Sequence, residues 1–163
     1  GMNEGDDHDH GKGGKPEAFY EALLTKGSVT RLAFASPSGL SGVAEMNEPK
    51  SWRAGFPAMG GVGSARGLAK FYDWVLRQDI LEELIRPRIS GLDHIQRIEN
   101  SFGFGMMLGL GPNMDCFGHP GAGGSYGFAN AQTGESFAFV MNRFEANLYP
   151  SEERLALCNE QIS

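Results

Sequence analysis

The segment 117–128, Phe-Gly-His-Pro-Gly-Ala-Gly-Gly-Ser-Tyr-Gly-Phe, constrains this chain more than any other. It has five glycines in twelve residues, and such a backbone must adopt positive φ angles or pass close to another group. A turn at 131–134 and an apolar run at 137–141 follow, which predicts a β-hairpin whose first strand opens with His119. Such an edge can present bare backbone N–H groups to a substrate oxygen, with a polar side chain beside them. The segment therefore predicts one wall of an active site.

The bulk composition predicts one folded domain and excludes several functions. A length of 163 residues suits a single domain, and 40% hydrophobic residues with 21% charged residues allow a packed core. The net charge of -6 argues against nucleic acid as a partner. No apolar run is long enough to span a membrane, and no secretory signal is visible, so we expect a cytoplasmic protein. We expect Cys116 and Cys158 to be free thiols.

The chain divides at residue 15. Residues 1–15 are polar, acidic and rich in glycine, which predicts a flexible arm, and residues 16–163 form the domain. The Asp and His residues at 6–10 could coordinate a divalent metal, but we interpret them as part of a solvated acidic tail. We expect no cofactor.

Helix signals are clear in the first half of the domain. We expect a short helix from Pro16 to Lys26 and irregular structure over 28–60, with Trp52 and Phe56 packed as anchors. Ser64 suits the N-cap of the strongest helix. A second short helix should cover 80–85. The stripe expected in the core at helical spacing comprises Leu68, Phe71, Tyr72, Val75 and Leu76.

The second half predicts an antiparallel meander of about three strands, at 102–108, 117–128 and 136–142. A last helix should begin at Ser151, with a buried face of Leu155, Cys158 and Ile162. The fold class is therefore α+β, an antiparallel sheet flanked by helices.

Three further patterns match known motifs poorly. Residues 123–127 fit G-x-S-x-G, but a nucleophile elbow needs a helix next and a triad His further on, whereas all four histidines precede Ser125. The glycines at 60–63 lack the lysine of a phosphate-binding loop, so we interpret them as a sharp turn into the helix. His94 reads as a surface residue, and no spacing indicates a metal site.

Five segments in order nevertheless resemble a known family. They are 28–35, 56–72, 102–105, 117–125 and 137–143. Together they are similar to the C-terminal half of the serine β-lactamase family, nearest to its class C-like esterases and β-lactamase-related hydrolases. The resemblance implies a partial β-lactamase/transpeptidase-like fold. It also implies acyl transfer, in which the Ser of S-x-x-K attacks a β-lactam or ester carbonyl, helped by that Lys and by the Tyr of a Y-x-N-type motif.

The third motif of that family, K-T-G or H-x-G, is matched by His119-Pro120-Gly121. By this resemblance His119 takes the place of the Lys and polarises the site. Gly121 completes the motif, and the N–H of Ala122 is one oxyanion donor. The implied ligand is a β-lactam or an ester.

The other two catalytic motifs are absent from these 163 residues. No serine is followed by Lys three residues on, and the only Tyr-x-Ser or Tyr-x-Asn is Tyr149-Pro150-Ser151, which follows the third motif instead of preceding it. Whether the chain is an enzyme is therefore uncertain. We expect a truncated serine-hydrolase domain that is inactive alone.

Two alternatives stay open. The chain is one half of a split hydrolase completed by another polypeptide, or it is a non-catalytic binding or oligomerisation module. In each case we expect an exposed sheet edge to be covered by a second copy or by a complementing chain.

Overall fold

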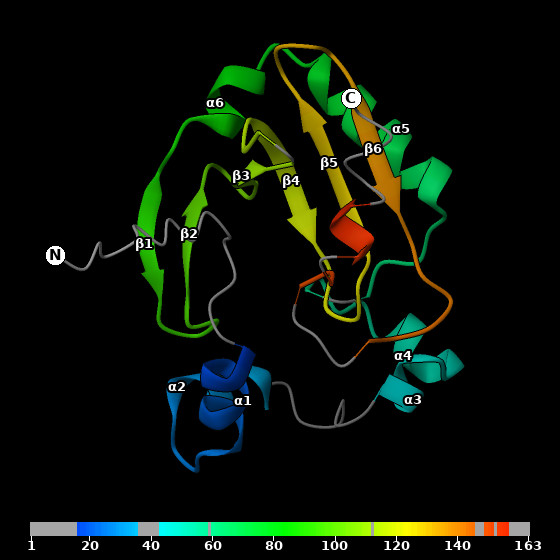
Figure 1. Ribbon diagram of the computed structural model, residues 1–163. Coiled ribbons are helices and arrows are strands. Elements are labelled where there is room, and N and C mark those ends of the chain that lie inside the picture. Colours follow the sequence, from blue (N-terminus) through cyan, green and yellow to red (C-terminus); the bar gives the residue numbers. More distant parts are fainter. Residues whose placement is uncertain are drawn as a thin grey trace, which may run out of the picture.

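The computed structural model describes residues 16–35, 43–58, 60–111, 113–145, 149–151 and 153–156. A six-stranded antiparallel sheet forms the frame of this part of the chain, with the strands in sequence order (Figure 1). This confirms the α+β class and the antiparallel meander. The strands are β1 (Ile89–Asp93), β2 (Ile98–Phe102), β3 (Met107–Leu110), β4 (Cys116–Pro120), β5 (Tyr126–Asn130) and β6 (Ser136–Phe139).

The sheet has more strands than the sequence predicted. The segment expected as one strand at 102–108 is split, because Gly105 takes a φ of 76° and turns the chain between β2 and β3. The segment 117–128 is likewise a hairpin, β4 and β5, and not a single strand. The hairpin of β1 and β2 was missed because β1 is mostly exposed and lacks an apolar alternation.

The helices are α1 (Pro16–Leu24), α2 (Val29–Phe34), α3 (Val43–Met46), α4 (Pro49–Arg53), α5 (Ala65–Leu76) and α6 (Leu81–Ile85), and residues 153–156 are also helical. None of the described helices is long and apolar enough to cross a bilayer. The expected helices at 16–26, from Ser64 and at 80–85 are confirmed, the first ending at Leu24. Residues 1–15, Cys158 and Ile162 lie outside the described residues.

The prediction of irregular structure over 28–60 was wrong for 29–34, 43–46 and 49–53, which are helical. Ser28 caps α2, since its hydroxyl oxygen accepts a hydrogen bond of 3.0 Å from the Arg31 amide. Pro49 occupies the first turn of α4, where a missing N–H is harmless. Trp52 is 56% exposed and donates its indole N–H to the Met46 carbonyl, so it ties α4 to α3 and is not a core anchor.

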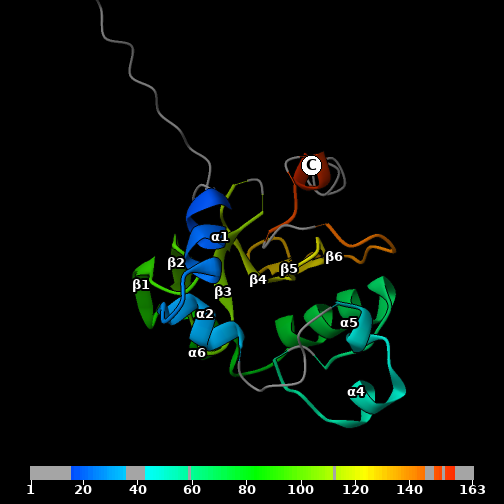
Figure 2. The same cartoon turned by 90° about the horizontal axis from the view of Figure 1, so that it is seen from below.

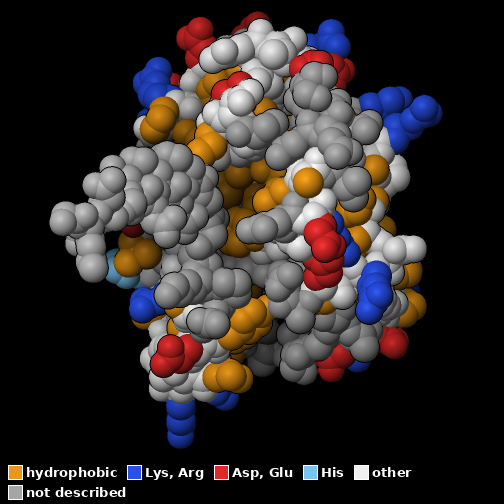
Figure 3. Space-filling view, viewed as in Figure 1, with side chains coloured by type: hydrophobic (Ala, Val, Ile, Leu, Met, Phe, Trp, Pro, Cys, Tyr) orange, Lys and Arg blue, Asp and Glu red, His pale blue; other side chains and the backbone are white. Residues whose placement is uncertain are grey.

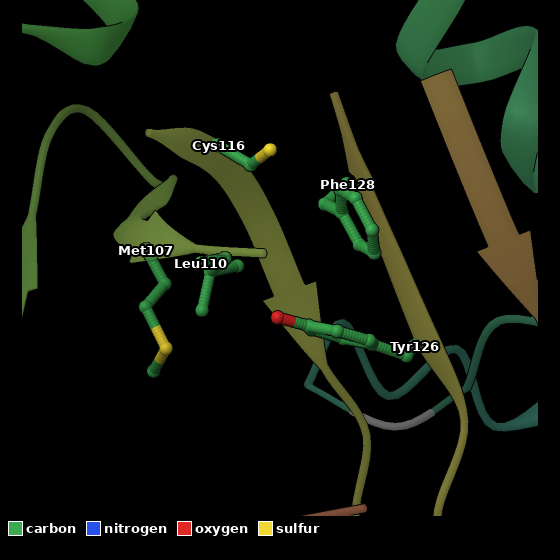
Figure 4. Packing of buried hydrophobic residues seen from close by; sticks show 5 residues of the cluster. All are labelled: Met107, Leu110, Cys116, Tyr126 and Phe128. Carbon is green, nitrogen blue, oxygen red and sulfur yellow. The ribbon is translucent and has the colours of Figure 1, made fainter. Parts of the chain in front are cut away.

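Helix α5 and the C-terminal segment lie on opposite faces of the sheet (Figure 2). Figure 4 shows the buried residues of the first core cluster. Tyr149 and Leu155 of the C-terminal segment are partly buried and pack against this cluster, as expected for Leu155. The second core cluster packs under α5. The first comprises Met107, Leu110, Cys116, Tyr126 and Phe128; the second comprises Tyr72, Val75, Phe117 and Ala129. Neighbours such as Phe117 and Cys116 belong to different clusters because successive strand residues face opposite ways.

Hydrophobic side chains are also visible in a hollow over the middle of the sheet on the face seen in Figure 3. This is the face that carries the first core cluster. The sheet is therefore apolar on both faces, as its burial by two different layers requires.

Helix α5 begins as predicted. The Ser64 hydroxyl oxygen accepts a hydrogen bond of 3.1 Å from the Gly67 amide. Tyr72 and Val75 are buried, and Leu68 and Leu76 pack partly buried beside them. Phe71 was wrongly predicted to be in the core: it is 46% exposed and stacks on Trp74, which is exposed as well. The buried stripe of α5 is thus narrower than the apolar pattern suggested.

Close contact between α5 and the sheet depends on Gly127 in β5. A Cβ atom at this position would lie 2.7 Å from the Tyr72 ring and 2.8 Å from a Leu68 methyl group. Both distances are shorter than carbon atoms tolerate, so α5 would have to move away from the sheet.

We therefore expect Gly127→Ala to lower the free energy of unfolding by about 1–3 kcal/mol, the usual effect of overpacking a core. Urea unfolding followed by circular dichroism measures this change. Gly61→Ala is the matched control, because a Cβ there meets nothing within 4 Å. A midpoint for Gly127→Ala equal to that of the control would contradict the proposed close packing.

Candidate active site

The hairpin between β4 and β5 folds the glycine-rich segment into a tight turn. The strands pair in register from Cys116 with Asn130 to Pro120 with Tyr126. The Gly121 amide then donates to the Ser125 carbonyl at 2.7 Å, and the Gly124 amide donates to the Gly121 carbonyl at 3.0 Å. Among the described residues, nothing accepts a hydrogen bond from the Ala122 N–H, which lies at the exposed tip. The sequence-predicted residues His119, Gly121 and Ala122 thus lie together at one end of β4.

His119 occupies the exposed end of β4 with a defined ring orientation. Its Nδ1 lies 2.6 Å from the Pro120 carbonyl oxygen. A carbonyl can only accept, so Nδ1 carries a proton, and Nε2 is the nitrogen that stays available to another molecule. The ring lies 6.1 Å from that of Phe102, which gives it an apolar neighbour on β2. The side chain is therefore held ready for a polar contact through Nε2.

Helix α5 supports this strand from behind the sheet. The buried Tyr72 forms a hydrogen bond with the backbone of His119, and its ring packs edge-on against Phe117. Burial raises the pKa of Tyr72 to about 12, which the bond to His119 only partly offsets. Tyr72 is thus a neutral structural residue near pH 7 and not a catalytic base.

The glycines of the turn are buried by the segment that follows β6. The Phe144 ring occupies the space where a Gly123 side chain would lie, and the Arg154 guanidinium does the same at Gly124. These glycines have φ angles of 90° and 108°, which L residues rarely adopt. Gly123 and Gly124 are therefore required both for the turn geometry and for the close approach of Phe144 and Arg154.

The other candidate nucleophiles and ligands do not join this site. Ser125 leads directly into β5, so the strand-turn-helix of a nucleophile elbow is absent, as expected. Burial raises the pKa of the Cys116 thiol to about 12, with Asp115 adding to the effect, so the buried thiol stays protonated. His94 is exposed in the β1–β2 turn, as predicted. The described residues contain no group of three or more His, Cys, Asp or Glu side chains that could hold a metal.

Tyr149 is excluded as a catalytic tyrosine by its surroundings. Its hydroxyl donates to Gln96 Oε1, and Gln96 accepts a further bond of 2.9 Å from Asn100. Burial raises the pKa of Tyr149 to about 12, and the nearby Asp93 carboxylate adds to the rise. The residue therefore ties the C-terminal segment to the β1–β2 hairpin.

Sequence reasoning missed the supporting residues of the site. Tyr72 carried a signal, because it belongs to the apolar stripe of α5, but nothing indicated that its hydroxyl reaches His119. Phe144 and Arg154 are 25 and 35 positions beyond His119 in the chain, and no local pattern links them to the turn.

We expect the free energy of unfolding to fall as the pH rises from 9 to 12. Tyr72, Tyr149 and Cys116 have ordinary pKa values of 10.0, 10.0 and 9.0, and all are raised to about 12 in the fold. The unfolded chain releases these protons first, so the stability present below pH 9 is lost on the alkaline side. Urea unfolding across this range should give a shallower slope for Tyr149→Phe than for the wild-type chain. At pH 7 the variant should be about 1 kcal/mol less stable through its lost hydrogen bond. Parallel slopes would contradict burial of the Tyr149 hydroxyl.

Comparison with known proteins places this geometry in a family. The beta-lactamase family model matches residues 8–158. The Esterase/beta-lactamase LipL of Mycobacterium tuberculosis is 34% identical over 103 residues, which cover 55% of this chain and 24% of LipL.

Two solved structures share the fold. A family VIII carboxylesterase superposes with a TM-score of 0.55 at 25% identity, over 62% of this chain and 32% of that one. A penicillin-binding protein homolog from Caulobacter crescentus gives a TM-score of 0.56 at 26% identity, over 61% of this chain and 31% of that one. The chain thus spans less than a third of each of these relatives. Since the family model covers most of its length, the chain belongs to the beta-lactamase family.

Proposed function

We propose that this chain supplies the third-motif wall of a serine hydrolase site that cleaves an ester or a β-lactam by acyl transfer. In this proposal His119 Nε2 and the Ala122 N–H face the reacting carbonyl, and Gly121 lies between them in the chain. The observation that carries the proposal is the N–H of the exposed Ala122, which has no acceptor among the described residues, beside an oriented His119.

The attacking hydroxyl and its base come from residues outside this sequence. No serine here has a lysine three positions on, and Tyr149, which is partly buried and bonded to Gln96, does not take the place of the Tyr of the second motif. The printed names of the relatives, esterase, beta-lactamase and carboxylesterase, suggest the substrate classes.

The wall alone cannot account for catalysis. One oxyanion donor contributes about 3–4 kcal/mol of transition-state stabilisation. Enzymes as a class lower their barriers by about 8–23 kcal/mol. The difference must come from a nucleophile, its base and a second donor. The 163-residue chain by itself should therefore bind a ligand without turning it over.

A chimaera tests the proposed role. Residues 64–156 should replace the aligned region of the mycobacterial LipL, and nitrocefin and p-nitrophenyl butyrate should serve as substrates. We expect turnover by the chimaera, and a fall in kcat/KM of about tenfold or more in its His119→Ala variant, the loss of one good hydrogen bond to a charged group. His94→Ala is the matched control and should keep full activity, because His94 is exposed in the β1–β2 turn.

Two results would overturn this role. One is a chimaera that folds and is active but is indifferent to His119→Ala. The other is turnover by the isolated chain that persists through extensive purification and disappears in His119→Ala, since a nucleophile would then lie within these residues.

A second candidate is a non-catalytic module that associates through a sheet edge. Its support is β1, an outer strand on which Ile89 is 69% and Leu92 is 48% exposed. Exposed strand edges with apolar side chains pair readily with another strand.

If a second copy covers β1, the chain should elute as a dimer at micromolar concentration in size-exclusion chromatography with light scattering. Leu92→Lys should shift it to a monomer, because a charge on an edge strand opposes pairing. Val62→Lys is the control, since Val62 is 79% exposed but lies outside the sheet. A wild-type monomer at all concentrations would rule out this candidate.

A further inference from the structure

Arg154 is largely buried and is bound to several groups at once. Its side chain is only 14% exposed. Nη1 donates to the Gly123 carbonyl at 3.0 Å, Nη2 donates to the Arg143 carbonyl at 3.2 Å, and Nε pairs with Glu145 Oε1 at 2.9 Å. The guanidinium carbon also lies 5.7 Å from the centre of the Phe139 ring. Each of the three guanidinium nitrogens of Arg154 thus has a partner.

Among these contacts, the hydrogen bond to the Gly123 carbonyl connects Arg154 to the candidate site. This carbonyl accepts from Arg154 and also from the Glu145 amide, at 3.0 Å each. Glu145 is in turn committed to Arg154, since its other carboxylate oxygen is buried with no partner among the described groups. One side of the turn is therefore fastened to the C-terminal segment, while its other side is fastened within the hairpin by the bond from Gly124 to Gly121.

These bonds restrain a turn whose residues have little intrinsic preference for one backbone conformation. Gly121, Gly123 and Gly124 surround Ala122, and glycine has more conformational freedom than any other residue. An oxyanion donor stabilises a transition state only if it is already oriented before the reaction. A turn of three glycines cannot supply that orientation alone.

We propose that Arg154, held by Glu145, is a positioning residue that fixes the 121–124 turn and so orients the Ala122 N–H. The proposal rests on the proposed function for its catalytic meaning, but its structural content can be measured without activity. Arg154 itself touches no reacting atom; it acts through the Gly123 carbonyl.

Nuclear magnetic resonance of the ¹⁵N-labelled chain tests the structural part. In Arg154→Met, which keeps the apolar stem, the order parameter of the Ala122 amide should fall from about 0.85 to below about 0.6. Amide exchange at Gly124 and Glu145 should rise at least tenfold more than exchange at Phe128 and Ala129 in β5. Arg154→Lys should lie between the two, since one ammonium cannot reach both carbonyls and the carboxylate together.

The controls separate positioning from general stability. Arg77→Met removes an exposed ion pair with Asp73 on α5 and should leave the turn amides unchanged. If Arg154→Met unfolds because Glu145 is left uncompensated, the double variant Glu145→Gln/Arg154→Met removes that charge and should show the same loosened turn. Equal increases in exchange at the turn and in β5 would overturn the proposal, as would an unchanged order parameter at Ala122.

The LipL chimaera tests the catalytic part. There Arg154→Met should lower kcat at least tenfold with little change in KM, because orientation of the oxyanion donor matters most in the transition state. An active chimaera that is indifferent to His119→Ala, together with a loosened turn in Arg154→Met, would refute the proposed function and leave the positioning role intact. An active chimaera in which Arg154→Met changes neither kcat nor the turn would refute the positioning role alone.

Discussion

The contact between α5 and the β4–β5 hairpin is the constraint on which the rest of the structure depends. Gly127 lets Tyr72 and Leu68 approach the sheet so closely that a single methyl group would separate them. That approach brings the Tyr72 hydroxyl to the backbone of His119 and buries Phe117 and Ala129. Because the end of β4 is fixed by this packing, the turn that follows it begins from a defined position.

The opposite face of the hairpin is secured by different means. Here Tyr149 and Leu155 pack against the first core cluster. Arg154 binds the turn itself, through its hydrogen bond to the Gly123 carbonyl. The hairpin is thus held between a helix that precedes it in sequence and a segment that follows it. Neither layer alone fixes the position of residues 121–124, because α5 contacts the strands and the C-terminal segment contacts the turn.

The sequence predicts the parts of this arrangement that have local causes. Ser64 caps α5 as expected, since a cap acts on its own backbone. The turn at 121–124 was missed, because 117–128 was expected as one strand. The β1–β2 hairpin and helices α2 to α4 were missed, because short and exposed elements bury too little apolar surface to show a period. Phe71 was misplaced for a related reason, as an apolar residue on a helix can remain at the surface. At the candidate site, His119, Gly121 and Ala122 were predicted through their motif and stay a prediction. Arg154 was not predicted, because two of its partners are backbone carbonyls that any residue could supply.

Under the proposed function, this difference explains how one wall of a site can fold without the residue that attacks. A backbone N–H donor and the end of a strand are features of the main chain. The hydrogen bonds from Gly121 to Ser125 and from Gly124 to Gly121 fix this part of the main chain within one hairpin. A nucleophile and its base are side chains that must meet at hydrogen-bond distance. The backbone half of the site therefore folds from contacts internal to the described residues. Under the proposed function the side-chain half comes from a further polypeptide segment. The backbone half offers it His119 Nε2 and the Ala122 N–H, which has no acceptor among the described residues.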